Sequence, residues 1–419
     1  MRFVLLMMLL FVPSLSYGMS KEVSYDANGI KKQNIKKPFY YDRGFHFESE
    51  NGLFSTNLQW RAQMRLSTPL ISDPRTPEDF SNDSDITNFE LRRVRMKIGG
   101  HGYQPWIKYY FEVDLQPSRN INDATANSSS RLIDWRIDVQ PYEELGFRVG
   151  QWKINYNRER VDSSGRQQFV ERSIVNRVFN IDRQVGFMIK GRFAKKTPFD
   201  MRYYAGVFNG NGRSVSNSSK KLMKMARIQW NPFGRELKWR QSDVIRHKKP
   251  TLSLAAAVVD NTGDCTRWSS GGCGSLDGLQ IGSDDQYNVK QYVAEMAYKY
   301  QGLSLQTEYH WKDVKDNTSG ALYDYEGMYS QIGYFFNELV STFPEELELA
   351  FRYAFVDEPD PSNLLLENKR KEYTLGINYF LAGHNNKVTL DYSYLTLDDA
   401  SDDRFYNDNR IRLQWDVSF

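Results

Sequence analysis

The stretch LFSTNLQWRAQMRL, residues 53–66, alternates between two kinds of side chain with a period of two. From residue 54 onward, the even positions carry mainly apolar groups, whereas the odd positions carry hydroxyl, amide and guanidinium groups. Because successive side chains of a strand point to opposite faces, this segment predicts a long strand between an apolar and a polar environment.

The same alternation recurs along the chain, and we find no helical period sustained over a comparable length. Counting the runs predicts sixteen strands, an even number, as in bacterial outer-membrane barrels. The predicted strands lie near residues 53–66, 88–99, 106–116, 131–140, 145–155, 183–193, 200–208, 222–230, 251–260, 289–300, 303–312, 327–336, 346–357, 371–381, 386–397 and 407–419.

The predicted connections alternate between long polar loops and shorter links, which is typical of an outer-membrane barrel. The link 231–250 is too long for this alternation, so we expect it to contain an extra short strand or a plug. The long loops are residues 67–87, 117–130, 156–182, 209–221, 261–288, 313–326, 358–370 and 398–406.

The two ends of the chain carry export signals. Residues 1–18, MRFVLLMMLLFVPSLSYG, place one arginine before an apolar run and predict a signal peptide cleaved near Gly18. The last ten residues, RIRLQWDVSF, alternate and finish in Phe419, which resembles the signal that outer-membrane barrels present to their assembly machinery. We therefore expect residues 19–43 to form a periplasmic extension and residues 44–419 to form the barrel.

This combination predicts an all-β protein, a transmembrane antiparallel barrel in the outer membrane of a Gram-negative bacterium. Beyond residue 18 there is no run of about 20 apolar residues, so a soluble secreted protein is the alternative from hydropathy alone. Closure of the barrel would satisfy the backbone groups that lipid cannot, and sixteen strands leave room for an aqueous channel.

The composition excludes several other classes of function. The chain has 55 Lys and Arg against 52 Asp and Glu, so its formal charge of +3 predicts no nucleic-acid partner. Its five histidines are scattered, and it has no HExxH, GxSxG or phosphate-loop motif, so we expect neither an enzyme nor a cofactor.

The two cysteines lie close together in CTRWSSGGC, at Cys265 and Cys273. In an oxidising compartment this spacing predicts a disulfide that closes a small loop. A zinc site would need further Cys or nearby His ligands, so we expect no metal.

The polar face of the first strands is predominantly basic. Cationic side chains that line a channel select anions, so this half of the lumen predicts an anion channel. A balanced lining of ion pairs in a general porin is the alternative. The inward basic positions are Arg61, Arg65, Arg93, Arg95, Lys97, Lys108, Arg136, Arg148, Lys190, Arg192, Arg202 and Arg227, opposed by Glu112, Asp114, Asp134 and Asp138.

The third long loop, residues 156–182, has about 27 residues, and loops of that length are usually functional or disordered. It carries five arginines and also apolar residues that could pack, so we expect it to fold inward and narrow the channel. Within it, Glu171 and Arg172 of FVERS could pin the loop to the wall. Arginine favours oxyanions because its planar fork binds two oxygens at once.

Several stretches of the chain, in this order, resemble the phosphate-selective porins O and P of bacterial outer membranes. The resemblance runs from about Gly44 to Phe419, and it implies a sixteen-stranded, trimeric porin whose inward third loop forms the constriction. The stretches are GFHFESENGLFS, FELRRVRMKIGG, LGFRVGQWK, FVERS, DRQVGFMIKG, YYAGVFNGNG, FRYAFVD, YTLGINYFLAGHNNKVTLDYSY and RLQWDVSF.

The resemblance also implies which residues bind the anion. Its phosphate site maps onto Arg92 and Arg93 of LRRVR, Asp134 of LIDWR and, where the family has lysine, Arg160 of NRERVDSS. Arg95 and Lys153 stand where the family places tyrosines, so this constriction is more basic than in the family. It predicts an anion site, but not a preference for phosphate over pyrophosphate or other anions.

Arg92 and Arg93 raise a geometric requirement because they are neighbours. A regular strand would turn only Arg93 into the lumen, so a pair that works together needs a bulge. Without one, Arg92 would be an interfacial anchor or an inter-subunit contact. Asp134 could accept a hydrogen bond from a protonated phosphate or simply hold the arginines in place.

The sequence therefore predicts a passive, anion-selective porin for phosphate or polyphosphate, embedded in outer-membrane lipid as a homotrimer. A general, weakly selective porin is the first alternative. A non-conducting structural or adhesin barrel is the second, and conductance would separate it from either porin.

Overall fold

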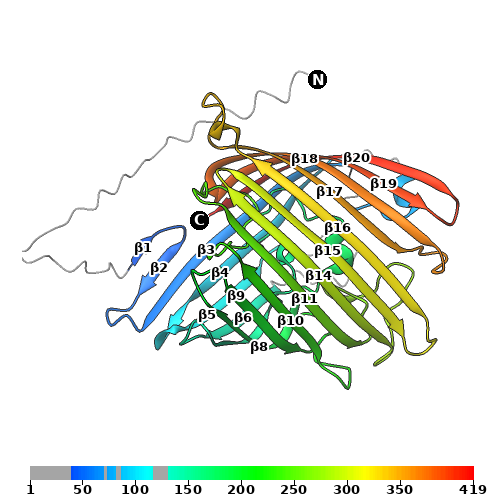
Figure 1. The fold of residues 1–419 in the computed structure, drawn as a ribbon, viewed down its shortest axis with the longest axis horizontal. Helices are drawn as coiled ribbons and strands as arrows, with labels where there is room; N and C mark the ends of the chain where they lie inside the picture. Colours follow the sequence, from blue (N-terminus) through cyan, green and yellow to red (C-terminus); the bar gives the residue numbers. More distant parts are fainter. Residues whose placement is uncertain (1–38, 70–72, 82–85, 117–130) are drawn as a thin grey trace, which may run out of the picture. The chain divides into compact units, whose positions relative to one another are not determined.

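The computed structural model describes residues 39–69, 73–81, 86–116 and 131–419. Sixteen antiparallel strands form a closed barrel in which neighbours along the chain pair with one another (Figure 1). They are β3 (Phe54–Thr68), β4 (Asn88–Gly102), β5 (Gln104–Asp114), β6 (Arg131–Val139), β7 (Gly146–Lys153), β8 (Arg183–Phe193), β9 (Asp200–Phe208), β10 (Met223–Asn231), β11 (Thr251–Gly263), β14 (Tyr287–Tyr300), β15 (Leu303–Asp316), β16 (Leu322–Tyr334), β17 (Leu347–Pro359), β18 (Glu367–His384), β19 (Asn386–Asp399) and β20 (Arg404–Ser418).

The first and last strands of the barrel close it. β20 pairs with β3 from Ile411 opposite Thr68 to Ser418 opposite Arg61. The last residue continues this ladder, because the Phe419 N–H donates to the Trp60 carbonyl at 2.9 Å and the Phe419 carbonyl accepts from the Trp60 N–H at 3.0 Å. The predicted barrel and its sixteen strands are thus confirmed.

The strands differ from the predicted ones mainly at their ends. β15 continues to Asp316, β16 begins at Leu322 and β18 begins at Glu367, so the β15–β16 hairpin is longer than its apolar alternation. Backbone pairing continues there although the outward face becomes polar, for example at the pair Asp313 and Asp324. Apolar alternation marks only the part of a strand that faces lipid. Backbone pairing between the strands extends beyond that part, so the strands are longer than the alternation predicts.

Smaller elements lie outside the sixteen strands. β1 (Phe39–Tyr41) and β2 (Phe45–Glu48) form a hairpin, and β2 extends the sheet by pairing with β3. The predicted start of the barrel at residue 44 falls inside this hairpin, whereas residues 1–38, with the predicted signal peptide, lie outside the described residues. The other elements are α1 (Pro77–Ser81), α2 (Arg158–Val161), α3 (Val175–Phe179), η1 (Phe336–Glu338), β12 (Arg267–Ser269) and β13 (Gly272–Gly274).

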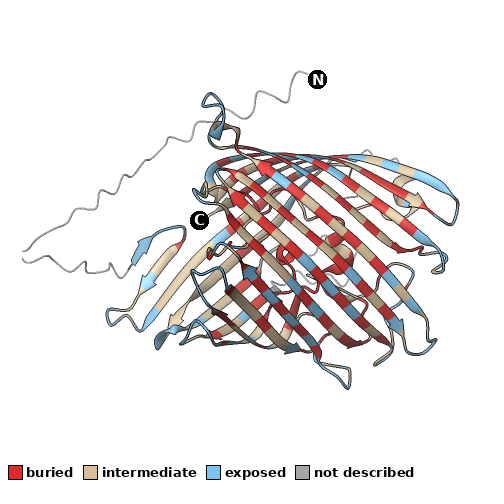
Figure 2. Cartoon of the chain, viewed as in Figure 1, coloured by how far each residue is buried: buried red, intermediate tan, exposed pale blue. Residues whose placement is uncertain are grey.

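None of the helices in the described residues is long and apolar enough to cross a membrane. Burial instead alternates along the strands, as the bands in Figure 2 show. In β14 the inward positions from Tyr287 to Lys299 are mostly buried, while outward Tyr292 remains 41 % exposed. Large apolar side chains point outward around the barrel, where they meet lipid.

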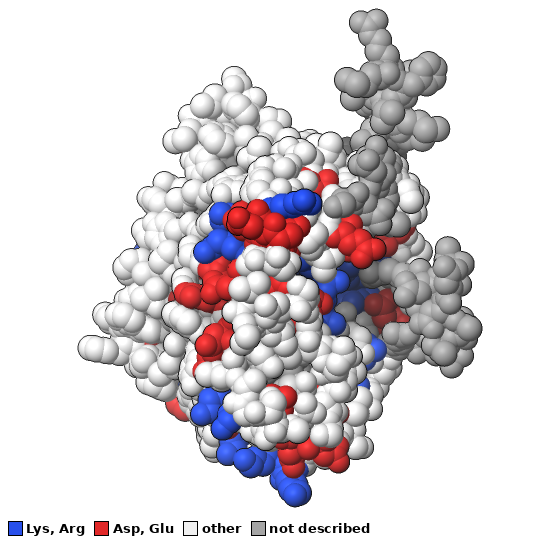
Figure 3. Space-filling view, turned by 90° about the vertical axis from the view of Figure 1, so that its right-hand side faces the viewer, with Lys and Arg blue, Asp and Glu red and all other residues white. Residues whose placement is uncertain are grey.

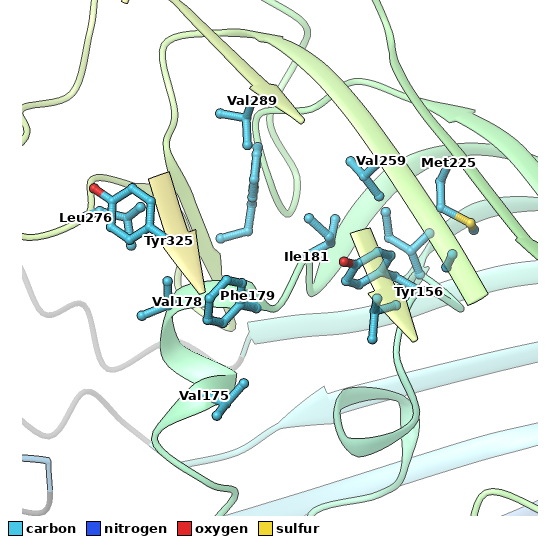
Figure 4. Packing of buried hydrophobic residues seen from close by; sticks show 14 of the residues in the cluster. Tyr156, Val175, Val178, Phe179, Ile181, Met225, Val259, Leu276, Val289 and Tyr325 are labelled. Atoms are coloured by element: carbon cyan, nitrogen blue, oxygen red, sulfur yellow. The ribbon is translucent and has the colours of Figure 1, made fainter. Parts of the chain in front are cut away.

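The buried apolar cluster lies inside the barrel, where two loops meet the wall. α3 of the third loop contributes Val175, Val178 and Phe179, and Figure 4 shows them beside residues of the strands and of the loop 264–286. Cys265 and Cys273 of that loop form a disulfide. The third loop therefore folds inward, as predicted, and packs like a core element.

Candidate functional site

The third loop, residues 154–182 and hereafter L3, is attached to one side of the lumen by carboxylates. We call this side, formed by β14 to β19, the far wall. Five of its inward acidic side chains are buried, and each accepts a hydrogen bond from L3. The pairs are Glu295 with Arg158 N (3.0 Å), Glu308 with Glu159 N (2.6 Å), Glu348 with Gln168 Nε2 (2.8 Å), Asp391 with Val170 N (3.0 Å) and Glu372 with Ile174 N (2.9 Å).

This attachment follows from the backbone chemistry of L3. Its helices α2 and α3 span only four and five residues, so most of its N–H groups find no acceptor within a helix. Buried N–H groups need acceptors, and the wall carboxylates supply them. These five acids of the far wall are consequently covered by L3 instead of facing the channel.

The opposite side, β3 to β8, carries most of the basic residues that the sequence predicts to face the lumen, and we call it the near wall. In β4, Arg93 pairs with Gln63 and Leu91 pairs with Met64, which leaves Arg92 as the extra residue of a bulge. The bulge turns both neighbouring arginines inward, as a joint role requires.

Arg92 and Arg93 converge, with Arg65 of β3, on the L3 carboxylate of Glu171. Glu171 Oε1 lies 2.8 Å from Arg65 Nη2, 2.8 Å from Arg92 Nη2 and 3.3 Å from Arg93 Nη2. Burial alone would raise the pKa of the Glu171 carboxyl, but Arg93, Arg65 and Arg92 outweigh it and hold the pKa well below its usual range. Glu171 is therefore ionised at neutral pH.

Asp134 and Arg160 are linked through two residues at the start of β8. Arg183 Nε lies 2.6 Å from Asp134 Oδ1, and Arg183 Nη1 lies 3.3 Å from Asp182 Oδ1. Asp182 in turn forms an ion pair with Arg160. Asp134 thus holds an arginine in place through a chain of alternating charges, and Arg160 is neutralised by the same chain.

Arg95 and Lys153 have contrasting environments. Arg95 is paired with Glu112 at 3.2 Å and Asp114 at 3.0 Å. Lys153 Nζ instead donates to the carbonyl oxygens of Arg160 and Asp162, both at 3.2 Å. The six predicted residues therefore have different partners. Arg92 and Arg93 bind Glu171, Asp134 and Arg160 belong to one chain of charges, Arg95 pairs with Glu112 and Asp114, and Lys153 binds carbonyl oxygens.

Arg172 is a site residue whose role the sequence does not reveal. Its Nη2 donates to the Asp162 carbonyl at 2.7 Å, so it shares an acceptor with Lys153. Burial and the neighbouring charge of Arg160 lower the pKa of the Arg172 guanidinium to about 9. A cation destabilised in this way would be stabilised by an incoming anion.

Several cations of the near wall and L3 form no ion pair with a carboxylate among the described residues, and Arg61, Lys97, Lys153 and Arg172 are among them. Arg61, for example, donates to the hydroxyls of Ser163 and Ser164, both at 2.7 Å. Figure 3 shows basic side chains inside a hollow of one face, with acidic side chains around it. The lumen thus has a positive excess on one side.

Beyond Asn231, where β10 ends, the link 231–250 contains no strand and enters the same space. Arg240 Nη1 lies 2.8 Å from Asp162 Oδ1, and Arg158 Nη1 donates to the Lys238 carbonyl at 2.8 Å. Gln241 binds both the Gln168 N–H and the Gln167 side chain. The link therefore supports L3, and the alternative of an extra strand in it is wrong.

Two further features define what the lumen can bind. A cavity of about 890 Å³ is lined by the near-wall residues Lys108, Arg136, Arg148 and Lys190. Asp264 and the two cysteines are the one grouping among the described residues with ligand atoms spaced for a metal ion, but the disulfide leaves no thiolate to bind it.

Comparisons with known proteins agree with this architecture. A curated protein of Aquifex aeolicus, described as uncharacterized, is 24% identical over 369 residues, covering 80% of this chain and 82% of its own. The outer-membrane channel DcaP of Acinetobacter baumannii aligns with a TM-score of 0.53 at 15% identity, covering 89% of this chain and 99% of DcaP.

Two other solved structures share the fold. An anion-selective porin from Comamonas acidovorans has a TM-score of 0.54 at 10% identity, covering 87% of this chain and 100% of its own. OmpT of Vibrio cholerae, in its trimer form, has a TM-score of 0.53 at 9% identity, covering 87% and 99%. At such low identity these structures show the fold alone.

The family is shown by a sequence model. The model of the phosphate-selective porins O and P matches residues 71–419, which is most of the chain and nearly the whole barrel. Together with the closed barrel, this identifies an outer-membrane channel rather than an enzyme. The chain belongs to the family of phosphate-selective porins O and P.

Proposed function

We propose that the chain forms a passive, anion-selective channel through which phosphate and related oxyanions cross the outer membrane. The observation that carries the proposal is the unequal treatment of charge in the lumen. Arg61, Lys97, Lys153 and Arg172 have no carboxylate partner in the described part of the chain, whereas the far-wall carboxylates are bound to L3. An anion that passes between L3 and the near wall meets uncompensated positive charge.

The predicted binding residues have different roles in this proposal. Lys153, with Arg172, attracts the anion directly, and the arginines at positions 92 and 93 supply the oxyanion-binding forks. Asp134 positions Arg183, and the ion pairs of Arg95 and Arg160 keep those side chains extended along the wall. The order of preference among phosphate, pyrophosphate and other oxyanions follows from how many forks each one engages.

The proposal includes the assembly and export of the protein. We propose a homotrimer, which the trimer form of the V. cholerae OmpT structure supports by analogy of fold. We also propose that residues 1–18 are removed near Gly18 on export, since their charge and apolar run suit a signal peptide.

The test is the reversal potential of the purified protein in a planar bilayer under a KCl gradient. We expect anion selectivity, and we expect added phosphate to reduce the chloride current. A Lys153→Ala variant should require several-fold more phosphate for half-block. Cation selectivity of the wild-type channel would refute the proposal, and equal block of Lys153→Ala and wild type would remove Lys153 from the site.

A further inference from the structure

Glu171 occupies the centre of a site built for an anion. Three guanidinium groups, from Arg65, Arg92 and Arg93, surround one oxygen of its carboxylate at 2.8–3.3 Å. Glu90 is the other acidic side chain described near these arginines, at 3.6 Å from Arg65 and 3.7 Å from Arg92. The cluster therefore holds three positive and two negative charges, and the closer negative charge comes from a loop.

The same guanidinium arrangement suits a free oxyanion. Arginine forks bind carboxylate and phosphate oxygens with the same geometry, so the Glu171 carboxylate stands in the position of a bound phosphate oxygen. The three arginines are on two neighbouring strands of the barrel and are held by its ladder. The arginines are thus the fixed part of the site, and the carboxylate is the part on the loop.

The backbone around Glu171 is anchored independently of its side chain. Its carbonyl accepts a hydrogen bond from Arg352 Nη1 at 3.1 Å, and Val170 N binds Asp391 at 3.0 Å. Ile174 N binds Glu372 at 2.9 Å on the other side. Because these far-wall contacts hold L3 in place, the Glu171 side chain can leave the arginines without releasing the loop.

We propose that Glu171 is a tethered internal anion that fills a three-arginine oxyanion site and exchanges with the transported oxyanion. This inference rests on the proposed anion channel and adds the residue that sets the affinity of its arginine site. A dianionic phosphate brings two charges to the arginines where Glu171 brings one. The displaced carboxylate remains near Arg172, which has no carboxylate partner in the described residues.

The exchange has a physical purpose in a channel. An ion must bind strongly enough to enter and weakly enough to leave. Three clustered arginines without a counter-charge would retain phosphate, whereas a tethered carboxylate competes for them and returns the ion to the channel. Glu171 therefore lowers the affinity of the site and raises the exit rate.

The experiment compares Glu171→Gln with Glu90→Gln in the full-length channel. Each variant loses one negative charge beside the same arginines, but only Glu171 occupies the site. We measure the concentration of inorganic phosphate that halves the chloride current, at constant pH and ionic strength. We expect Glu171→Gln to lower this concentration about tenfold or more, and Glu90→Gln to change it less than about threefold.

The outcomes separate the inference from the proposed function. Unchanged or weaker block in Glu171→Gln, or equal shifts in the two variants, overturns the exchange, whatever the selectivity of the wild type. A wild-type reversal potential that shows cation selectivity overturns the proposed function instead.

A further pair of variants distinguishes exchange from a structural role. If Glu171 only pins L3, Glu171→Gln will raise the chloride conductance and weaken the block, and that result overturns the inference. Glu171→Asp keeps the charge, so it should stay within about threefold of wild type. Adding Arg65→Ala to Glu171→Gln should abolish the gain in affinity, because the site then lacks one fork.

Discussion

The near wall and the far wall of the barrel are both rich in charged side chains, but L3 leaves them in different states. On the far wall, carboxylates such as Glu308 and Asp391 are buried and accept hydrogen bonds from the L3 backbone. On the near wall, cations such as Lys97 and Lys153 have no carboxylate partner among the described residues. L3 therefore covers carboxylates of the far wall at the same time as it narrows the lumen.

This difference explains why the net charge of the chain is uninformative. A formal charge of +3 in 419 residues would suggest a balanced lining. The charge that matters is the charge left uncovered once L3 has bound its acceptors. A porin of this design can be anion-selective with nearly equal numbers of acids and bases.

The largest effect is expected when Asp391, which anchors L3 to the far wall, is replaced. Its carboxylate accepts two hydrogen bonds from Arg412, at 2.8 and 2.7 Å, and one from Val170 N at 3.0 Å. Asp391→Ala leaves a buried guanidinium and a buried N–H unpaired, so it should destabilise the folded barrel by about 3–5 kcal/mol. The free energy of unfolding in urea, followed by gel mobility in detergent micelles, measures this loss.

Asp391→Asn is the matched control, because it retains an oxygen for Val170 N. We expect a smaller loss of stability and a smaller change in chloride conductance than with alanine. Stability of the alanine variant within about 1 kcal/mol of wild type would show that far-wall anchoring is dispensable.

The ordinary features of the fold could be read from the sequence, while the L3 contacts could not. Alternation along a strand depends on lipid on one side and water on the other, so strands such as 183–193 are visible in the sequence alone. The need for a bulge at Arg92 was also visible, because two adjacent arginines cannot share one face of a regular strand.

The partners of the site residues depend on contacts distant in sequence. Glu171 reaches Arg65 across 106 residues, and Val170 reaches Asp391 across 221 residues. No local sequence pattern predicts such pairs. The stretch FVERS shows that an acid and a base are adjacent, but it does not show which distant residues they contact. The resemblance implies six residues of one constriction, whereas the partner of each one is visible only in the structure.

A second test, of the contact between L3 and the far wall, uses pH. Burial raises the pKa of the Glu159 carboxyl to about 7, Arg352 opposes the rise, and Glu308 adds to it. The folded state thus holds this proton more tightly than the unfolded chain, where the carboxyl titrates near 4.5. Its contribution to stability is complete below pH 4.5 and is lost as the pH rises through about 7, on the order of 3 kcal/mol.

Glu159→Gln removes this titration and leaves the other groups unchanged. We expect the difference in unfolding free energy between the glutamine variant and wild type to grow in favour of glutamine from pH 5 to pH 8. A difference that is independent of pH would show that Glu159 stays ionised. The charged and titratable groups around Glu159 are Glu308 and His310 of β15, Arg352 of β17 and Arg172 of L3.

On the near wall, Lys97→Glu places a negative charge opposite L3 and tests whether the near-wall cations set the anion selectivity. Charges a few ångströms apart in a partly shielded lumen interact by about 1 kcal/mol or more, so the anion-to-cation permeability ratio should fall about fivefold. Lys224→Glu makes the same charge change on an exposed position of β10 and should leave the ratio unaltered. Equal effects of the two variants in reversal-potential measurements would mean that overall charge, not the near wall, sets selectivity.

The smallest effect is expected where the link 231–250 meets L3. Arg240 pairs with Asp162 at 2.8 Å, but the Arg240 side chain is 34% exposed, and such pairs contribute about 1 kcal/mol or less. Asp162 Oδ1 also keeps the Ser163 N–H at 2.8 Å, so the carboxylate is not left without a donor. Arg240→Ala should therefore change the single-channel conductance less than about twofold. A larger increase would mean that L3 depends on the link as much as on the far wall, and the channel would then have two supports for one loop.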